Sequence, residues 1–401
     1  MEDQLLVVNC GSSSLKLAVF DQDRRKLVSV LAERLNTDEA SARISGTAET
    51  IPLPDNGSYE RVLAALVEAL KTRGILCQDP VAIGHRVVHG GETFRGAALI
   101  DDQVVAAIDH CASLAPLHNP VNLAGIAATR ALYPEVPQVA VFDTAFHQTL
   151  PPKAFRYALP EAYYRDWAVR RYGFHGTSHY FMAQEAARLL ARAPDTTSII
   201  SAHLGNGCSV AAIRNGRSVD TSMGLTPLEG LVMGTRSGDV DPSLFDYLAG
   251  KGLSAAEVHE ALNKQSGLLG LSGESNDMRT LCDLAEQGHS GAALAIDVFC
   301  FRLARYLGAM TASLTALDAL VFTGGIGENS ARVRQQTVEH LSLLGITLDS
   351  VANARNGADT EGRISAAESR YPVLVIPTNE ERVIAEEAQR LAQSSQSHSP
   401  D

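Results

Sequence analysis

The stretch LLVVNCGSSSLKLAVF, residues 5–20, constrains the fold more than any other part of the chain. Two apolar runs, 5–8 and 17–20, flank a polar centre, and runs of this length bounded by turn residues are typical of buried strands. The short join, rich in Gly and Ser, predicts a hairpin. Gly11 lets the backbone approach a ligand, and Lys16 adds a positive charge beside the N–H and hydroxyl donors of the turn. Such a turn suits a polyphosphate, but an ordinary hairpin with a solvated tip is an equal alternative.

Composition limits the partners of the chain. Its 401 residues, 45% of them hydrophobic, suffice for two domains with cores of their own. The formal net charge is -12 and no long Lys/Arg run is present, so nucleic acid and an anionic membrane surface are poor partners. An anionic substrate must therefore be held by a local cluster of Arg, His or Lys.

Cysteine usage and the N-terminal sequence indicate a compartment. The six cysteines are scattered without a CxxC pair, which disfavours a zinc site or a disulfide framework and fits a reducing environment. The first residues lead into a strand without the pattern of a signal peptide, and no apolar run reaches the length of a membrane span. These features predict a cytoplasmic protein.

Two stretches of the first half carry candidate site residues at strand ends. In VAIGHRVVHGGETF, residues 81–94, a buried strand leads into Arg86 and a Gly-Gly turn. QVAVFDTAFHQTL, residues 138–150, predicts a central strand that ends in Asp143, and ligands usually bind at the carboxyl ends of strands in α/β folds. A surface charge for Arg86 and a turn or cap residue for Asp143 are equal alternatives.

The second half repeats the plan of the first hairpin. In TSIISAHLGNGCSVAAIRNGRSV, residues 197–219, an apolar strand, a glycine turn and a second apolar strand follow one another. Aligning Asn9 with His203 places Gly11 on Gly205. The identity is slight, but two hairpins of one design predict two similar domains that face a cleft.

A histidine pair precedes this second hairpin. RRYGFHGTSHYF, residues 170–181, sets His175 and His179 four residues apart. The spacing would suit a metal pair, but there is no HExxH and no acidic third ligand nearby, which disfavours a metal. We expect His179 in the first turn of a helix that runs to Arg192.

Glycine-rich segments follow in the second half. Residues 223–242 form a long loop with Arg236, and a loop of this length inside a compact domain is usually functional or disordered. A helix is predicted over 290–317. Residues 318–330 predict a strand, a glycine turn and a helix start, where a nucleotide could lie against backbone N–H groups. Neither the GxGxxG nor the GxxxxGK[ST] spacing is present.

Ten short motifs run in order along nearly the whole chain: NCGSSSLK, GHRVVHGGE, PLHNP, VFDTAFH, YGFHGTSH, HLGNG, MGLTPLEG, MGTRSGDVDP, FTGGIGENS and PTNEE. Together they resemble the acetate kinase family, within the superfamily of acetate and sugar kinases, heat-shock chaperones and actin. Each motif alone is weak, whereas ten in sequence at sensible spacing are hard to reach by chance. Two positions depart from the family pattern: Cys10, where alanine is common, and Met278, where phenylalanine is common.

The resemblance implies an α/β fold of two ribonuclease-H-like domains, each with a mixed central sheet flanked by helices. ATP and a short carboxylate would bind in the cleft between them. The N-terminal domain would span 1–150, with the helix 382–395 packing back onto it, and the nucleotide-binding domain 151–381. Residues 396–401 would form a disordered tail. The family also implies a homodimer.

The resemblance assigns roles to matching positions. Asp143, His175, Arg236 and Arg86 match the catalytic residues, and Asn9 and Glu380 match the residues associated with magnesium. The positions that match ATP contacts are Ser12, Ser14, Lys16, His203, Leu204, Gly205, Asn206, Gly207, Asp277, Met278, Arg279, Gly325, Ile326, Gly327, Glu328 and Asn329. The positions that match the acetate site are Arg86, Val88, Leu117, His118, Phe174 and Pro227.

The implied reaction transfers the γ-phosphoryl group of ATP to acetate, giving acetyl phosphate and ADP, with Mg²⁺ or alternatively Mn²⁺. A carboxylate with a pKa of roughly 4.3 is already ionised at neutral pH, so no base is needed to activate it. Asp143 would then orient an arginine and the magnesium waters. A propionate or butyrate kinase would keep the same cleft with a wider pocket. A non-catalytic ATPase module would keep the nucleotide loops without needing Arg86 and Arg236.

Overall fold

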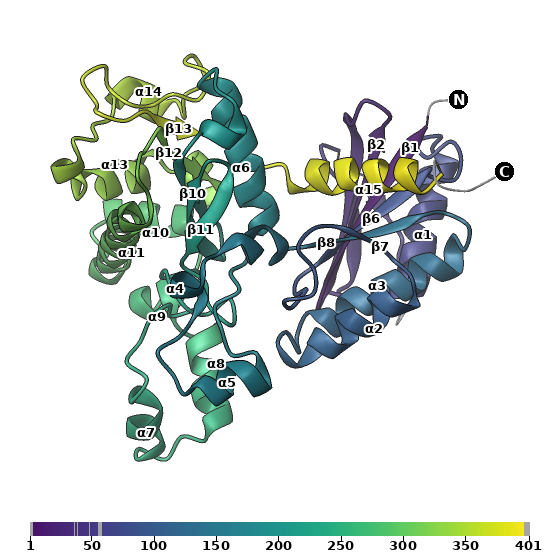
Figure 1. Ribbon diagram of the computed structural model, residues 1–401, viewed down its shortest axis with the longest axis horizontal. Helices are drawn as coiled ribbons and strands as arrows, with labels where there is room; N and C mark the ends of the chain where they lie inside the picture. Colours follow the sequence, from purple (N-terminus) through teal and green to yellow (C-terminus); the bar gives the residue numbers. More distant parts are fainter. Residues whose placement is uncertain (1–2, 36, 38, 48, 55–57, 397–401) are drawn as a thin grey trace. The chain divides into compact units, whose positions relative to one another are not determined.

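The computed structural model describes residues 3–35, 37, 39–47, 49–54 and 58–396, which fall into two units (Figure 1). The first unit contains the residues up to Gln148 together with those from Asn379 onward, and the second contains Thr149–Thr378. The chain thus leaves the first unit two residues earlier than the sequence predicted and returns to it three residues earlier. Of the tail expected over 396–401, only residue 396 is described, as the last residue of a helix, and 397–401 lie outside the described residues.

The first unit is built on an eight-stranded mixed sheet in the order β5-β4-β3-β2-β1-β6-β8-β7. The strands from β5 to β1 pair antiparallel, β1, β6 and β8 are parallel to one another, and β7 is antiparallel to β8. The strands are β1 Gln4–Gly11, β2 Ser14–Asp21, β3 Lys26–Glu33, β4 Ser41–Ile44, β5 Thr50–Ile51, β6 Ala82–Val87, β7 Ala98–Leu99 and β8 Gln138–Phe142.

Helices cover both faces of this sheet. The helices are α1 Tyr59–Thr72, α2 Asp102–His110, α3 Asn119–Leu132 and α15 Glu380–Gln396. Alternate strand residues explain the two cores, because successive side chains of a strand point to opposite faces. Leu6 and Val8 pack with α1, whereas Leu5 and Val7 pack with Ile384 and its neighbours on α15. Figure 1 shows α15, in yellow, lying across β1, β2 and β6.

The second unit repeats the central strand order of the first. Its sheet runs β11-β10-β9-β12-β13, with β9 antiparallel to β10 and parallel to β12. The strands are β9 Ile199–Leu204, β10 Cys208–Arg214, β11 Arg217–Thr221, β12 Ala319–Thr323 and β13 Val373–Val375. Strands β3-β2-β1-β6-β8 of the first unit have the same order and relative directions. The expectation of two similar α/β domains with mixed sheets is confirmed.

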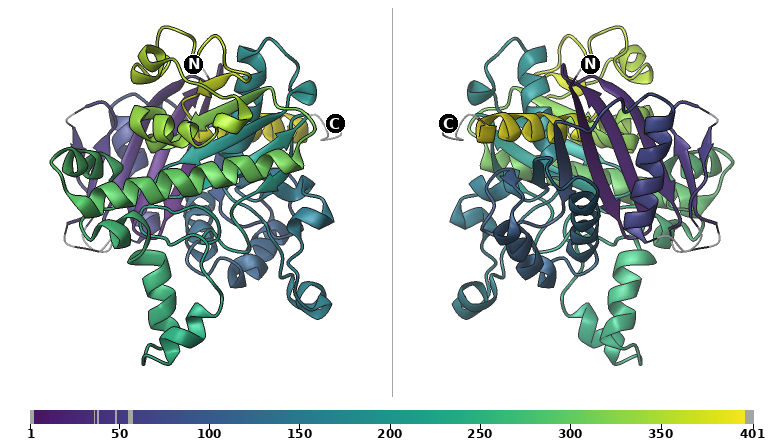
Figure 2. Two further views of the ribbon diagram at one scale, coloured as in Figure 1. Left: turned by 90° about the vertical axis from the view of Figure 1, so that its left-hand side faces the viewer. Right: turned by 90° about the vertical axis from the view of Figure 1, so that its right-hand side faces the viewer.

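The helices of the second unit also lie on both sides of its sheet. Figure 1 shows α6 on one side and α11 on the other, and Figure 2 shows α11 as the long green helix. The helices are α4 Pro152–Phe155, α5 Glu161–Trp167, α6 Gly176–Leu189, α7 Leu244–Ala249, α8 Ala255–Lys264, α9 Gly267–Ser272, α10 Met278–Glu286, α11 Ser290–Met310, α12 Gly324–Asn329, α13 Ala331–Glu339 and α14 Ser350–Ala354.

Four local predictions differ from the structure. The strand that precedes Asp143 is second from the edge rather than central; it is fully buried because β7 covers its outer side. The helix predicted over 290–317 ends at Met310, where the Thr311 hydroxyl bonds back to the Gly308 carbonyl. The helix expected to reach Arg192 ends at Leu189. The glycines after β12 form no separate turn, because α12 begins at Gly324.

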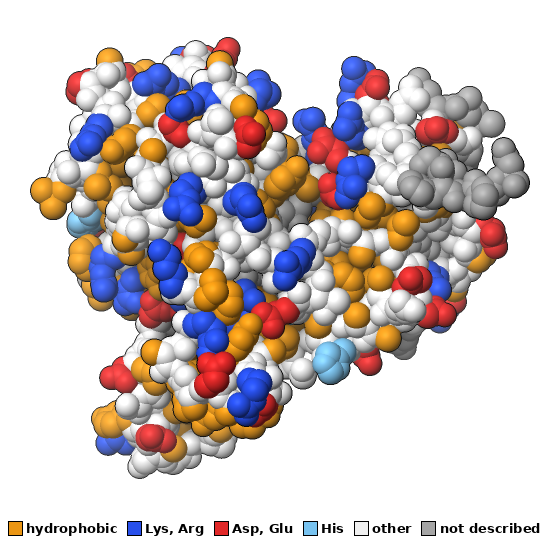
Figure 3. Space-filling model, in the orientation of Figure 1, with side chains coloured by type: hydrophobic (Ala, Val, Ile, Leu, Met, Phe, Trp, Pro, Cys, Tyr) orange, Lys and Arg blue, Asp and Glu red, His pale blue; other side chains and the backbone are white. Residues whose placement is uncertain are grey.

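Surface charge, the state of the cysteines and the hydrophobicity of the helices are the other features that bear on the sequence analysis. On the face drawn in Figure 3, acidic and basic side chains are interspersed. All six cysteines are free thiols. Among the described helices, none combines the length and the apolar character that crossing a bilayer requires.

Candidate functional site

An arginine–aspartate pair stands at the carboxyl ends of β6 and β8 in the first unit. Arg86 Nε and Nη2 donate to the two carboxylate oxygens of Asp143 at 3.0 and 2.7 Å. Asp143 is 1% exposed, and its backbone N–H donates to the Val87 carbonyl. The carboxylate of Asp143, together with that of Glu380, raises the pKa of Arg86. The two hydrogen bonds therefore fix the plane of the Arg86 guanidinium, as expected for an arginine that binds a carboxylate.

Two asparagines on α3 fix the backbone beside this pair. Asn122 accepts from the Val88 N–H at 3.0 Å and donates to the Cys10 carbonyl at 3.0 Å, which ties the end of β6 to that of β1. Asn119 accepts from the His89 N–H and donates to the His89 carbonyl. Asn119 lies in the PLHNP motif and Asn122 follows it closely, but only Leu117 and His118 of this stretch were predicted to be site residues. An asparagine near a predicted helix start is usually a cap, so its long-range role gave no separate signal.

The first turn of α15 contains two glutamates, and one of them contacts the first unit's hairpin. Lys16 forms an ion pair with Glu381 at 2.6 Å, so this predicted ATP contact has a carboxylate partner. Glu380 is the first residue of α15, and its buried Oε1 has no hydrogen-bond partner among the described residues. The β1–β2 turn consists of Ser12 and Ser13 alone, because the strands continue through Gly11 and from Ser14.

A cluster of histidines joins the second unit's hairpin to α6: His203 lies on β9, whereas His175 and His179 lie at the start of α6. His175 caps α6 in the left-handed conformation, with φ 55°, which costs a non-glycine residue on the order of 1–3 kcal/mol and is concentrated at functional sites. Its ring stacks on His203 at 4.3 Å between centroids, and His203 Nδ1 shares a hydrogen bond with Ser178. His179 lies in the first turn of α6, as predicted, and contacts Ser201 and Ser209.

Arg236 reaches the same hairpin from the long loop 223–242. A Cβ built on Gly207 would lie 3.4 Å from His175 Nε2 and 3.6 Å from Arg236 Nη1, so both side chains close around this glycine. Arg236 Nη1 donates to the Pro227 carbonyl at 2.8 Å. In the described part of the chain no carboxylate pairs with Arg236, and burial lowers its pKa. A partly buried guanidinium without a counter-ion is suited to an anionic ligand.

Carboxylates anchor the two ends of this loop. Glu229 pairs with Arg171 at 2.5 Å and accepts from the Tyr157 hydroxyl. Asp239 accepts from the Gly230 N–H at 2.8 Å and from the Tyr306 hydroxyl. The loop is therefore ordered by Glu229 and Asp239, whose contacts were not predicted because the partners Arg171, Tyr157 and Tyr306 are distant in sequence.

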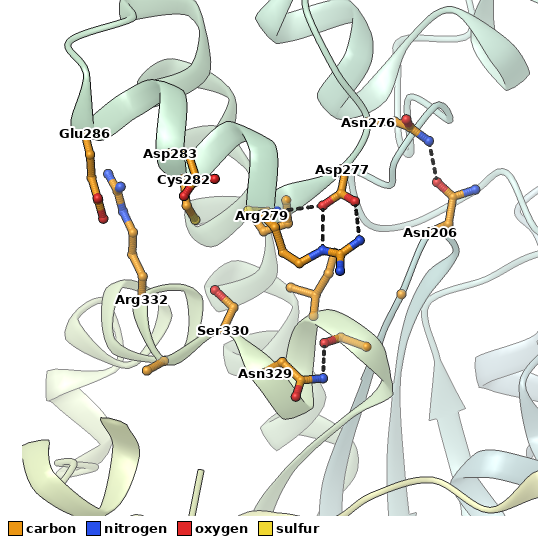
Figure 4. Close-up of a pocket in the computed structure, with 15 residues that line it drawn as sticks. Asn206, Asn276, Asp277, Arg279, Cys282, Asp283, Glu286, Asn329, Ser330 and Arg332 are labelled. Carbon is orange, nitrogen blue, oxygen red and sulfur yellow. Dashed lines mark hydrogen bonds and ion pairs between the residues drawn. The ribbon is translucent and has the colours of Figure 1, made fainter. Parts of the chain in front are cut away.

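Three segments of the second unit enclose a cavity of about 950 Å³, shown in Figure 4. The predicted nucleotide residues that line it are Gly205, Asn206, Asp277, Met278, Arg279, Gly325, Ile326 and Asn329. They come from the β9–β10 turn, the start of α10 and α12. Cys282, Glu286 and Arg332 extend the cavity beyond the predicted set.

The cavity's polar groups are held in place by local contacts. Asp277 caps α10 and pairs with Arg279 through two hydrogen bonds, which lower the pKa of the Asp277 carboxyl. Asn276 donates to Asn206 at 3.1 Å. Met278 is buried, so it lines the cavity from its base.

The remaining predicted nucleotide residues near α12 are packed into the fold. Gly324 requires its positive φ of 77° and its missing side chain, because a Cβ would lie 2.7 Å from the Leu204 carbonyl oxygen. Glu328 Oε1 accepts from the backbone N–H groups of Gly324 and Thr378, both at 3.0 Å. Glu328, near the end of α12, thus links the start of that helix to Thr378 by hydrogen bonds.

A completely buried arginine on α13, Arg334, donates hydrogen bonds to backbone carbonyls of α12. Arg334 donates to the Gly327 and Glu328 carbonyls at 2.7 and 3.0 Å and to Asn353 Oδ1 at 2.8 Å. Burial lowers the pKa of Arg334 to about 10. Arginine in a polar helix such as α13 normally indicates a solvated face, so no sequence pattern marked Arg334 as buried.

The residues of the predicted acetate pocket come from both units. Val88 and Phe174 are buried, whereas Leu117 is 61% exposed. Val88, Leu117 and His118 belong to the first unit, and Phe174 and Pro227 to the second. Their grouping in one pocket remains a prediction.

A family model described as the acetokinase family matches residues 4–386. The chain belongs to this family. An acetate kinase of Ectopseudomonas mendocina (strain ymp) is 55% identical over 383 residues, which cover 95% of this chain and 97% of that protein.

Solved structures of acetokinase relatives are similar over the same span. The crystal structure of Porphyromonas gingivalis acetate kinase has a TM-score of 0.91 and 41% identity, covering 97% of this chain and 99% of that one. A propionate kinase from Francisella tularensis subsp. tularensis SCHU S4 has a TM-score of 0.91 and 45% identity, with the same coverage.

Proposed function

We propose that this acetokinase-family chain is an acetate kinase. It transfers the γ-phosphoryl group of ATP reversibly to the carboxylate of acetate, giving acetyl phosphate and ADP. The observation that carries the proposal is the partly buried guanidinium of Arg236, which has no carboxylate partner among the described residues and meets His175 Nε2 around Gly207. The nucleotide cavity begins at the same β9–β10 turn.

Different side chains bind the nucleoside, the transferred phosphoryl group and the acetate. The cavity lined by Asn206, Asp277 and Ile326 takes the nucleoside of ATP. Arg236 and His175 donate to the oxygens of the phosphoryl group in transfer, where charge spreads as the bond to ADP breaks. Arg86 binds the acetate carboxylate, and Asp143 fixes the plane of its guanidinium. The acetate oxygen attacks phosphorus without losing a proton, so neither Asp143 nor His175 needs to act as a base.

A divalent metal accompanies ATP in this reaction, and we propose Mg²⁺. The buried Oε1 of Glu380 lacks a hydrogen-bond partner among the described residues, and with the Asn9 side chain it would supply hard oxygen ligands of the kind that Mg²⁺ prefers. When bound, the metal neutralises charge on the nucleotide phosphates. Removing the Glu380 carboxylate, as in Glu380→Ala, should raise the magnesium concentration needed for half-maximal activity. An unchanged magnesium requirement would place Glu380 outside the metal site.

A hydroxamate assay for acyl phosphate with acetate, propionate and butyrate tests the function. Acetate should give the highest kcat/KM. Formation of acyl phosphate from none of the three acids would contradict the proposal and favour a non-catalytic ATPase module.

Propionate kinase activity is the second candidate, because the Francisella protein named a propionate kinase is 45% identical. Val88 is the proposed discriminator: it is buried and follows Arg86 by two residues. One methylene in an apolar pocket is worth about 1–3 kcal/mol, so Val88→Ala should raise the propionate-to-acetate ratio of kcat/KM. Loss of stability with an unchanged ratio would make Val88 a packing residue only.

From the family resemblance we also propose a cytoplasmic homodimer. The six free thiols fit a reducing compartment. Light scattering coupled to gel filtration measures the oligomeric state, and a monomeric mass would contradict the dimer.

A further inference from the structure

Three buried side chains of the second unit and the half-buried His175 form a continuous line of hydrogen bonds. Ser201 Oγ lies 3.1 Å from His179 Nδ1, and His179 Nε2 lies 2.8 Å from Ser209 Oγ. Ser209 Oγ lies in turn 2.9 Å from His175 Nδ1. Ser201 and His179 have no assigned role in the reaction, yet they connect to the ring that is proposed to contact the phosphoryl group.

The line must have a direction, because each hydroxyl has one proton to donate. If Ser201 donates to His179 Nδ1, then His179 Nε2–H donates to Ser209, and Ser209 donates to His175 Nδ1. If the line runs the other way, His175 Nδ1–H donates to Ser209, Ser209 to His179 Nε2, and His179 Nδ1–H to Ser201. The direction therefore determines which nitrogen of His175 carries its proton.

Ser201 decides between the two directions. Its side chain is 0% exposed, and within the described residues its hydroxyl has one hydrogen-bond partner, His179 Nδ1. In the first direction the Ser201 proton is used. In the second it is buried without an acceptor, and a buried donor left without a partner keeps its full desolvation penalty. A cationic His175, whose Nδ1 must donate, leaves either the Ser201 proton or the Ser209 proton without an acceptor among the described residues.

We propose that Ser209 is a positioning residue that holds His175 as the neutral tautomer with its proton on Nε2. The inference deepens the proposed function and rests on it for its catalytic consequence: Nε2 is the nitrogen that meets Arg236 around Gly207, and as an N–H it donates to a phosphoryl oxygen. The stacked His203 ring and the left-handed backbone of His175 hold the plane of the imidazole. The hydrogen bond from Ser209 to Nδ1 determines the tautomer of His175, which the position of the ring alone does not determine.

The direct test is ¹⁵N NMR of the enzyme labelled at the histidine ring nitrogens, with His175 assigned by its loss in His175→Gln. The expected spectrum shows His175 with a proton-bearing Nε2 and an unprotonated Nδ1. A proton on Nδ1 would overturn the inference. Because the spectrum is recorded without turnover, it is independent of the proposed function. The expected tautomer in an enzyme that fails to phosphorylate acetate would refute only that function.

Kinetics of Ser209 variants supply the second test. Ser209→Ala should lower kcat about tenfold, a part of the 10²–10³ that loss of a whole positioned donor costs, and should leave the KM for ATP within about twofold. Ser209→Thr keeps the hydroxyl and should recover most of kcat together with the Nε2–H signal. Thr221→Val is the matched control, because it removes another buried hydroxyl of this sheet, one that bonds the Val210 carbonyl. Equal effects of Ser209→Ala and Thr221→Val on kcat and on the His175 signals would reduce Ser209 to packing.

Discussion

At the scale of single residues, burying the charged guanidinium of Arg236 costs the folded protein free energy. Burial lowers its pKa, which means that the protein destabilises the charged form, and no carboxylate compensates among the described residues. The Pro227 carbonyl and the Met233 sulfur are its polar contacts. An arginine in such a place is stabilised when an anion binds beside it.

Replacing Arg236 by lysine should therefore leave a folded protein with a large loss of kcat. Lysine keeps the charge but lacks the planar fork of donors, and losing a transition-state arginine costs roughly 10³-fold or more. Arg214→Lys is the matched control, because Arg214 is exposed at the end of β10 in the same unit. Comparable turnover by the two variants would remove Arg236 from the catalytic set.

His85 predicts how the first unit responds to acid. It is buried, and burial lowers its pKa to about 4 while its ring hydrogen-bonds Gln138. In the unfolded chain its pKa is 6.5, so between pH 6.5 and 4 the unfolded state binds a proton that the folded state does not. Stability therefore falls as the pH falls through this window.

Lowering the pH from 7 to 5 should cost on the order of 2 kcal/mol from His85 alone. Urea unfolding of the wild-type protein and of His85→Gln at both pH values measures this contribution. The variant should lose less stability than the wild type between pH 7 and 5. Equal losses would show that another group carries the acid sensitivity.

Residue chemistry was partly predictable from sequence. Arg86 and Asp143 were singled out separately, and the fold joins them in one ion pair because their strands β6 and β8 are adjacent. Ser209 and Arg334 were not found. Their roles depend on partners far away in the chain, and a serine in a strand or an arginine in a polar helix carries no signal of its own.

At the scale of elements, the seating of α15 on β6 is a tight contact. A Cβ on Gly84 would lie 2.5 Å from Ile384 Cγ2 and 2.9 Å from the Ile384 carbonyl oxygen. The second of these atoms is backbone and cannot rotate away. The glycine thus sets how closely the last helix approaches the sheet.

Gly84→Ala should destabilise the first unit by about 1–3 kcal/mol, the usual cost of overpacking. Calorimetric unfolding measures the change, with Gly96→Ala as the control, since a Cβ there would meet no atom within 4 Å. Unaltered stability of Gly84→Ala would mean that α15 moves away from the strand without cost.

Hairpins were the best-predicted elements and helix ends the worst. Both Gly-rich hairpins fold as expected, because two apolar runs joined by a short turn have few alternatives. The end of α11 was misplaced by seven residues, because apolar residues continue past Met310 and only a side-chain bond at Thr311 indicates the stop.

At the scale of the whole molecule, the likeness of the two hairpins, aligned at Asn9 and His203, predicted two similar domains but not the strand order that their sheets share. These residues occupy equivalent places: Asn9 pairs with Lys16 across the first hairpin, and His203 with Ser209 across the second. Sequence alone could not establish the equivalence, since strand order depends on pairings between distant segments.

The order of the two units along the chain limits when each of them can fold during translation. The second unit is one continuous segment, whereas the first lacks α15 until residues 380–396, which follow the whole second unit, have been translated. Until then Leu5, Val7 and Phe20 have no Ile384 or Ala388 against them. The apolar face of β1 and β2 therefore stays uncovered while the second unit is being translated, and the first unit can close only afterwards.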